Sequence, residues 1–287
     1  MRNSLFVARV IDVTDPEDDR LADFRDLTTA DRRPDRPGGR GLVLAEGVVV
    51  VRRLLASPYP VRGVLGVRRK LDELAAELSP LPVDVYATSA DVMAKVVGFH
   101  LNRGVLAAAD RAAPADLDRL LASARMLAVL EGINDHENLG ALFRNAAALG
   151  VDGVLLGARC ADPLYRRSVR VSMGHVLGVP FATLPRWPDD LHLLRHNGFR
   201  LLALTPRAGS TPLDRASGLA GARVALLLGA EGPGLSAEAL AAADELVSVP
   251  MAPGVDSLNV ATAAAIAFYA VGLTCAPGQV DCPPPRR

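Results

Sequence analysis

Short apolar runs alternate with amphipathic segments along the first part of the chain. Apolar runs predict strands over residues 5–13, 42–44, 61–67, 83–87 and 104–109. The segments between them predict helices over residues 15–27, 47–56, 69–78 and 90–97. Residues 31–40 are rich in proline and glycine and predict a polar loop. This alternation predicts a small α/β sandwich domain over residues 1–110.

The second part of the chain repeats the alternation more regularly. Strands are predicted over residues 126–130, 154–156, 181–184, 201–204, 224–228 and 246–249, and helices over 138–149, 165–177, 191–197, 236–242 and 259–273. The strands are continuous runs of Val, Leu and Ile, which favours a parallel sheet covered on both faces. We therefore expect an α/β domain over residues 125–275, joined by a linker at 111–124 and followed by a disordered tail at 276–287.

Composition narrows the class of protein. With 287 residues, 50% of them hydrophobic and 22% charged, the chain can bury two cores and is not globally disordered. Cys160, Cys275 and Cys282 are far apart and lack metal-ligand spacing, so we expect reduced thiols and no zinc site. The apolar stretch at residues 260–273 is too short to span a bilayer, and the N-terminus lacks a signal peptide. The sequence predicts a cytoplasmic protein without membrane or metal partners.

The charge pattern leaves two interpretations open. The formal net charge is zero, which argues mildly against nucleic-acid binding. Almost all the positive charge is arginine, since only Lys70 and Lys95 are lysines. The basic residues cluster as Arg32, Arg33, Arg36 and Arg40; Arg52 and Arg53; Arg68, Arg69 and Lys70; and Arg166, Arg167 and Arg170. Each cluster is either a solvated surface or a set of guanidinium forks for phosphate oxygens.

Three polar motifs follow apolar strands in the second domain. They are NLGALFRN at residues 138–145, LGAEGPG at 228–234 and VPMAPGVDSLNVA at 249–261. Ligands of a doubly wound sheet bind beyond the carboxyl ends of its strands, where all three motifs are expected. The glycine-rich motif lacks both the GxGxxG pattern and a P-loop lysine, so by itself it is either a binding loop or a plain turn.

In this order and spacing the motifs closely resemble the SpoU (TrmH-like) group of SPOUT methyltransferases. The resemblance implies an α/β fold with a deep trefoil knot, S-adenosyl-L-methionine as cofactor, an RNA substrate (rRNA or tRNA) and a homodimer. It also implies methyl transfer to a ribose 2′-hydroxyl. By the same resemblance the catalytic residues are Asn138, Arg144, Glu231, Ser257 and Asn259, and the cofactor-binding positions are Gly229, Val249, Met251 and Leu258.

Arg144 raises a chemical question. The matching arginine of the family is proposed to activate the 2′-hydroxyl, but arginine is effectively never deprotonated in proteins. We therefore expect Arg144 to act electrostatically, on the developing alkoxide or on a flanking phosphate. Glu231 is a candidate for holding its guanidinium, and a plain surface arginine is the alternative. The resemblance also implies that, in the homodimer, Arg144 of one subunit completes the site of the other.

The N-terminal domain is similar to the L30e-like substrate-binding domain that precedes many SpoU catalytic domains. The matching stretches are LAEG at residues 44–47 and GFHLNRGV at 98–105. His100 within the second stretch is either a structural loop histidine or an RNA contact.

Two other functions remain as alternatives at this point. A catalytically silent RNA-binding protein on the same scaffold is disfavoured because Arg144, Glu231, Ser257 and Asn259 are all present. A nicotinamide-dependent dehydrogenase is disfavoured because no glycine fingerprint follows the first strand. The sequence thus predicts an RNA 2′-O-methyltransferase whose target nucleotide stays open.

Overall fold

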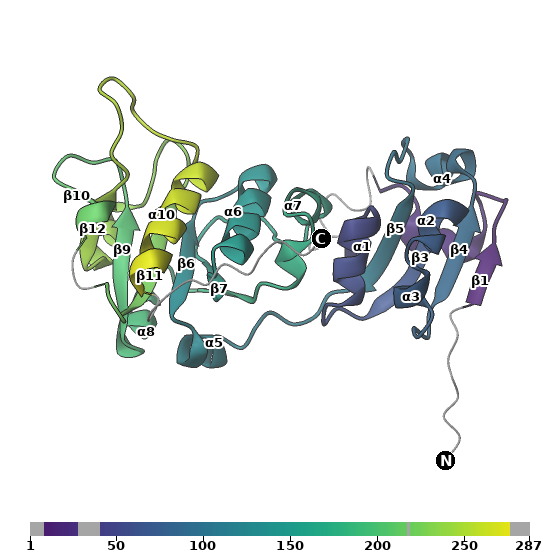
Figure 1. Ribbon diagram of the computed structural model, residues 1–287, viewed down its shortest axis with the longest axis horizontal. Coiled ribbons are helices and arrows are strands. Elements are labelled where there is room, and N and C mark those ends of the chain that lie inside the picture. Colours follow the sequence, from purple (N-terminus) through teal and green to yellow (C-terminus); the bar gives the residue numbers. More distant parts are fainter. Residues whose placement is uncertain (1–8, 28–40, 217–218, 276–287) are drawn as a thin grey trace, which may run out of the picture. The chain divides into compact units, whose positions relative to one another are not determined.

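The computed structural model describes residues 9–27, 41–216 and 219–275 (Figure 1). The expected loop at 31–40, its arginine cluster, Cys282 and the expected tail at 276–287 lie outside these residues. Internal contacts divide the chain into two compact units. Unit 1 comprises Met1–Ala113 and Asp162–Gly178, and unit 2 comprises Pro114–Ala161 and Val179–Arg287.

Unit 1 is built on a mixed five-stranded sheet in the order β1-β4-β3-β5-β2. Its strands are β1 (Arg9–Asp12), β2 (Leu42–Glu46), β3 (Val61–Val67), β4 (Asp84–Thr88) and β5 (Val105–Asp110). β1, β3 and β4 are parallel, and β5 runs antiparallel to β2 and β3. The predicted α/β sandwich is present, and each of its five strands overlaps one of the predicted apolar runs.

The helices of unit 1 depart from prediction at their ends. They are α1 (Val48–Leu55), α2 (Arg68–Asp72), α3 (Ala75–Leu78), α4 (Ala90–Val97) and the 3-10 helix η1 (Asp19–Phe24). The helix expected over residues 69–78 is two short helices, and the one expected over 15–27 is a single 3-10 segment. Leu21 and Phe24 of η1 pack with Met93 of α4 in one core cluster, so burial rather than helix propensity holds this segment.

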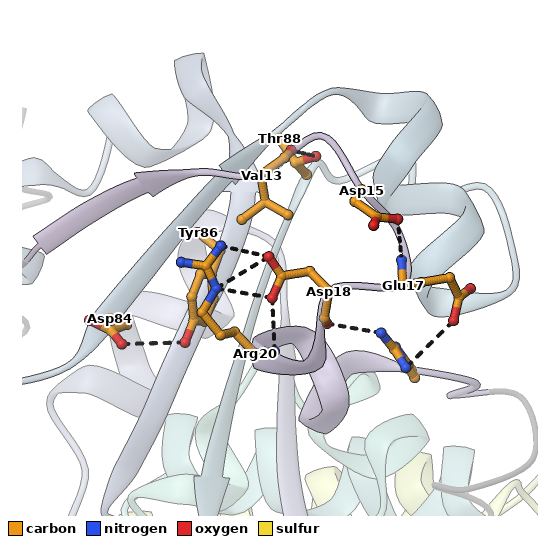
Figure 2. Close-up of polar contacts among 9 residues, drawn as sticks. Val13, Asp15, Glu17, Asp18, Arg20, Asp84, Tyr86 and Thr88 are labelled. Carbon is orange, nitrogen blue, oxygen red and sulfur yellow. Dashed lines mark hydrogen bonds and ion pairs between the residues drawn. The ribbon is translucent and has the colours of Figure 1, made fainter.

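Asp18 organises the polar contacts around η1 (Figure 2). Its Oδ1 accepts from the backbone N of Arg20 at 3.0 Å, and its Oδ2 accepts from Nη2 of Arg20 at 2.6 Å. These hydrogen bonds lower the pKa of the Asp18 carboxyl from 3.8 to about 2, because they stabilise its charged form. Asp18 is therefore the N-cap of η1, three residues after the expected start of the helix.

We expect Arg20→Ala to raise the pKa of Asp18 towards 3.8, as measured by NMR titration of its carboxyl carbon. A depressed carboxyl pKa contributes stability that is present above pH 3.8 and is lost as the pH falls towards 2. The variant should therefore lose less stability than the parent over this window. Arg25→Ala is the control, because Arg25 is the smallest of the causes of the shift. An unchanged pKa in Arg20→Ala would contradict the assignment.

Segment 162–178, which contains the helix predicted over residues 165–177 of the second domain, packs within unit 1. It holds α7 (Arg166–Val171) and the 3-10 helix η2 (His175–Leu177), separated by positive φ angles at Met173 (54°) and Gly174 (84°). Arg53 of α1 donates to the backbone O of Met173, and Arg111 forms an ion pair with Asp162. These contacts tie the segment to the N-terminal sandwich.

Unit 2 contains a fully parallel seven-stranded sheet in the order β10-β12-β9-β11-β6-β7-β8. Its strands are β6 (Met126–Glu131), β7 (Gly153–Leu156), β8 (Phe181–Thr183), β9 (Phe199–Leu204), β10 (Thr211–Pro212), β11 (Arg223–Gly229) and β12 (Glu245–Ser248). The prediction of a parallel sheet is confirmed. The short strand β10 was not expected, since two residues leave no apolar pattern.

Helices cover both faces of this sheet. They are α5 (Leu117–Ser123), α6 (His136–Ala148), α8 (Leu191–His196), α9 (Ala237–Ala242) and α10 (Val260–Cys275), with the 3-10 helix η3 (Leu213–Arg215). Leucines of α5, α8 and α9 share one core cluster with β6, β9 and β11. α6 and α10 contact each other and lie side by side in Figure 1.

The expected linker at 111–124 is wrong over its second half, because α5 lies there. Asp116 caps this helix by accepting from the backbone N of Arg119 at 2.9 Å, and Leu120 and Leu121 are buried. Arg223 donates to the backbone O of Ala124 at 2.9 Å, and so satisfies a carbonyl at the end of the helix. The Asp116 cap and the paired leucines are the sequence signals for this helix.

The helix α10 is apolar on all sides. Ala264, Ala267 and Phe268 are fully buried, whereas Tyr269 and Leu273 expose 59% and 54% of their surface. An apolar helix normally has every side covered. Within the described residues, no helix has the length and apolar character needed to cross a bilayer.

Candidate active site

A cavity of about 400 Å³ opens at the carboxyl ends of β9, β11 and β12. Its lining includes six residues that the sequence marked as site positions, namely Gly229, Glu231, Val249, Met251, Ser257 and Leu258. Strand order explains the convergence. β9 lies between β11 and β12 in a parallel sheet, so the loops that follow these strands meet at one edge.

The glycine-rich loop after β11 is folded tightly on itself. A Cβ atom at Gly229 would lie 2.3 Å from the backbone C of Gly234 and 2.3 Å from the backbone N of Leu235. The backbone N of Gly234 donates to the O of Ala230 at 3.0 Å, and Gly232 has a φ of 84°. Gly229 is required by this close approach of backbone to backbone, so the loop is more than a plain turn.

A buried carboxylate that the sequence analysis missed anchors the same loop. Glu131, the last residue of β6, pairs in register with Gly229 and is 3% exposed. Its Oε1 accepts from Nε1 of Trp187 at 2.7 Å, and its Oε2 accepts from the backbone N of Ser236 at 2.8 Å. An acidic residue ending an apolar strand was the available signal.

Asn259 joins the three motifs through its side chain. Its Nδ2 donates to Oδ1 of Asn138 and to Oε1 of Glu231, each at 2.7 Å. Its Oδ1 accepts from the backbone N of Ala261 at 3.0 Å and of Thr262 at 3.2 Å, which caps α10. The Asn259 amide group therefore links helix α6 and the glycine-rich loop through its two hydrogen atoms, and caps α10 through its oxygen.

Arg144 lies apart from this cluster. Glu231 accepts from Asn259 and makes no ion pair with Arg144, so the expected Glu231–Arg144 contact is not made within the described residues of one subunit. Arg144 is exposed, does not line the cavity, and has no hydrogen bond or ion pair with another described residue. Six residues along a helix place the side chains of Asn138 and Arg144 about 120° apart, so both cannot face one point.

Helix α6 begins two residues earlier than predicted. Oδ1 of Asp135 accepts from the backbone N of Glu137 and of Asn138, each at 2.8 Å. Asp135 is therefore the N-cap, and Asn138 lies in the first turn with its side chain towards Asn259.

We expect Asn259→Asp to lower the free energy of unfolding at pH 7 by about 1–2 kcal/mol, because a carboxylate would face two acceptors that have lost their donor. The helix cap survives in this variant and is lost in Asn259→Ala, so the comparison separates repulsion from capping. Urea unfolding measures both variants. A parent-like stability of Asn259→Asp would contradict the hydrogen bonds to Asn138 and Glu231.

Comparison with known proteins now decides the family. The model of the SpoU rRNA Methylase family matches residues 125–269, which contain all three motifs and the cavity. The chain belongs to the SpoU methylase family. This SpoU protein is 57% identical over 261 residues to an uncharacterized tRNA/rRNA methyltransferase of Mycobacterium tuberculosis, covering 91% of each chain. The recognition drawn from the motifs is confirmed, and the dehydrogenase alternative is wrong.

Solved structures share the fold of the SpoU protein. An rRNA methyltransferase from Sinorhizobium meliloti matches with a TM-score of 0.74 at 25% identity, covering 92% of this chain and 98% of that one. The SpoU methyltransferase AviRb from Streptomyces viridochromogenes matches with a TM-score of 0.73 at 24% identity, covering 88% and 96%. Both likenesses extend through the two units. The trefoil knot stays a prediction.

Potential metal-binding side chains do not cluster in the described part of the SpoU protein. Within residues 9–27, 41–216 and 219–275, no group of three or more His, Cys, Asp or Glu side chains is placed to hold a metal ion. Cys160 is partly buried, and burial raises the pKa of its thiol.

Proposed function

We propose that this SpoU protein transfers a methyl group from S-adenosyl-L-methionine to a ribose 2′-hydroxyl of structured RNA, either rRNA or tRNA. The observation that carries the proposal is the cavity at the strand ends, where Asn259 ties the three motifs together. Relatives described as tRNA/rRNA methyltransferases support the substrate class. A solved rRNA methyltransferase of the same fold, described as AdoMet-bound, supports the cofactor.

The cavity fits the proposed cofactor. Its volume of about 400 Å³ lies within the range of small-molecule sites, roughly 300–1,000 Å³. Leu204, Val249 and Met251 offer apolar surface for a purine ring, and Glu231 and Asp256 offer carboxylates for the positive charges of the donor. The close-packed loop at Gly229 brings backbone groups to the wall. When bound, the cofactor supplies an electrophilic methyl group.

The residues of this chain would prepare the acceptor hydroxyl. Methyl transfer forms a bond from the 2′-oxygen to the methyl carbon and breaks the bond from that carbon to sulfur, while the hydroxyl proton leaves to solvent. Arg144 stays charged throughout and lowers the energy of the negative charge that develops on the oxygen. Asn138, Glu231 and Asn259 hold the three loops in place, and Ser257 lies in the wall beside them.

A second copy of the chain would bring Arg144 to the cavity. Arg144 does not line the cavity of its own chain, so a partner's Arg144 is the group that we propose to complete the site. α10 carries an exposed apolar stripe of Ile266, Tyr269 and Leu273 at helical spacing. Such a stripe is typical of a face covered by another subunit.

We expect the parent protein to sediment as a dimer and Tyr269→Asp/Leu273→Glu to sediment as a monomer, because both changes place charge in the stripe. The monomer should keep its affinity for S-adenosyl-L-methionine and lose methyl transfer. Analytical ultracentrifugation, calorimetry and an assay of methyl transfer to RNA measure the three properties. A monomeric parent with full activity would contradict the dimer.

Two measurements test the proposed reaction. Calorimetry should show binding of S-adenosyl-L-methionine or its demethylated product, and absence of heat on folded protein would count against the cofactor. Purified tRNA and rRNA are then incubated separately with the donor, and nucleosides are analysed by mass spectrometry. A 2′-O-methylnucleoside in one pool supports the proposal. RNA binding without any transfer would support the silent RNA-binding alternative.

A further inference from the structure

Unit 1 carries a basic surface that the proposed reaction does not use. Two cavities mark it: one of about 150 Å³ and one of about 240 Å³. The smaller is lined by Glu46, Tyr165, Arg166, Arg167 and Arg170. The larger has Arg69, Lys70, His100, Asn102 and Arg103 in its lining.

Glu46 connects the two cavities. It lines the smaller one, and its Oε1 lies 3.9 Å from Nε of Arg103, which lines the larger one. Its Oε2 lies 3.7 Å from Nη1 of Arg166. The two cavities therefore share a guanidinium–carboxylate–guanidinium bridge, and together they form one surface, which we call the Glu46 surface.

The burial of Glu46 is unusual for a surface cation cluster. The residue is 7% exposed, and its Oε2 is buried without a hydrogen-bond partner among the described residues. Both ion pairs are longer than hydrogen bonds, so Glu46 orients the neighbouring guanidinium groups without occupying their donors in short contacts. Burial of such a carboxylate is costly, and the excess positive charge around it offsets the cost.

Packing holds the two arginines at Glu46. Gly47 has a φ of 89°, and a Cβ atom there would lie 2.8 Å from Cδ of Arg103, so the Arg103 stem crosses the backbone closely. The guanidinium carbon of Arg166 lies 4.8 Å from the ring centroid of Phe99. Stacking on the aromatic ring holds the guanidinium plane of Arg166 beside Glu46.

Charge identifies the class of ligand. Five arginines and Lys70 line the two cavities, whereas Glu46 is the sole carboxylate among the described lining residues. Lys70 is paired with Glu73 at 2.7 Å, and arginines make up five of the six cationic side chains in the two linings. Arginine forks match the oxygens of phosphodiesters, and phosphate oxygens are the main hydrogen-bond acceptors of nucleic acids in their complexes with proteins.

We propose that the Glu46 surface binds phosphodiester groups of the substrate RNA, with Glu46 as a positioning residue that aims Arg103 and Arg166. This inference rests on the proposed function and names the part of unit 1 that would contact the substrate. The site combines the N-terminal sandwich with α7, so the predicted domain of residues 1–110 alone lacks half of it.

The experiment measures binding of a fluorescein-labelled RNA hairpin to the full chain by anisotropy, over a series of salt concentrations. Arg103→Ala and Arg170→Ala should each weaken binding roughly tenfold at low salt, the scale of one charge-assisted hydrogen bond. Each should also lower the slope of log affinity against log salt by about 0.7–0.9, the value for one released counterion. Arg62→Ala is the matched control, because Arg62 is similarly exposed and already paired with Asp23 and Asp110.

The direction in which Glu46→Gln changes the RNA affinity tests the positioning role of Glu46. Removal of a negative charge from a purely electrostatic surface strengthens binding to RNA. If Glu46 positions Arg103 and Arg166, the variant binds RNA more weakly than the parent in spite of its higher net charge. Stronger binding by Glu46→Gln overturns the positioning role. Parent-like binding and salt slope of Arg103→Ala and Arg170→Ala overturn the site, and keep the inference falsifiable should Glu46→Gln not fold.

Failure of the inference can be told from failure of the proposed function. All variants should bind S-adenosyl-L-methionine as the parent does, because the cofactor cavity belongs to unit 2. A parent that binds RNA together with site variants that bind equally well overturns the Glu46 surface alone. A parent that binds no RNA overturns both the surface and the proposed function.

Discussion

Arg144→Ala is expected to lower the rate of methyl transfer about 10²-fold or more, the scale of removing one well-placed electrostatic group. The affinity for S-adenosyl-L-methionine should hardly change, because Arg144 does not line the cavity of its own chain. Stability should also be retained, since the side chain is exposed and makes no ion pair with a described residue. Single-turnover kinetics and calorimetry measure the two effects.

Arg144→Lys separates two roles of the guanidinium. Substantial remaining activity indicates that a point charge suffices, whereas near-complete loss indicates that the forked geometry is needed. Arg119→Ala, which removes an exposed arginine from α5 of the same unit, is the control and should turn over like the parent. If Arg144→Ala turns over at close to the parent rate, the proposed mechanism fails even though the fold is intact.

Gly229→Val is expected to abolish cofactor binding. The first side-chain atom would lie 2.3 Å from two backbone atoms of the same loop, far inside contact distance, so the loop between residues 229 and 235 must move. These residues form part of the cavity wall, and its displacement closes or reshapes the site. Calorimetry should show no heat with S-adenosyl-L-methionine.

The control for this change is Gly178→Ala. A Cβ atom there would have its nearest neighbour, the backbone O of His175, at an ordinary 3.9 Å. The variant should therefore bind the cofactor normally. Circular dichroism checks that Gly229→Val retains its helices. Normal cofactor affinity in Gly229→Val would mean that the cavity at β11 is not the cofactor site.

The two inactive variants together test whether Arg144 acts across a dimer. A mixed dimer of Arg144→Ala and Gly229→Val contains one site with an intact cofactor loop from one chain and an intact Arg144 from the other. Mixing should therefore restore part of the parent rate. If Arg144 serves its own chain, no site in the mixture is complete and activity stays absent.

Much of the architecture was predictable because strands of buried sheets have a local signature. The continuous apolar runs at β6, β9 and β11 predicted a parallel sheet, and the structure confirms this prediction. The predictions of secondary structure were wrong where the local sequence pattern was weak, or where the tertiary structure overrode it. α5 was taken as a linker because its two buried leucines are few, and the helix expected over 165–177 is interrupted by left-handed backbone at Met173 and Gly174.

The candidate site divides in the same way. The second and third motifs predicted most of the cavity lining, because each follows a strand and parallel strands end at one edge. The first motif contributes no lining residue, and Leu204, Thr205 and Pro206, which follow β9, lie outside all three motifs. Tertiary structure alone decided the partners of the motif residues: Glu231 and Asn138 meet at Asn259, while Arg144 neither joins them nor lines the cavity of its own chain. Glu131 and the Glu46 surface depend on contacts between residues more than a hundred positions apart, such as Glu131 with Ser236 and Glu46 with Arg166. Spacing along a chain describes one element at a time, whereas such contacts are set by strand order and by packing between elements.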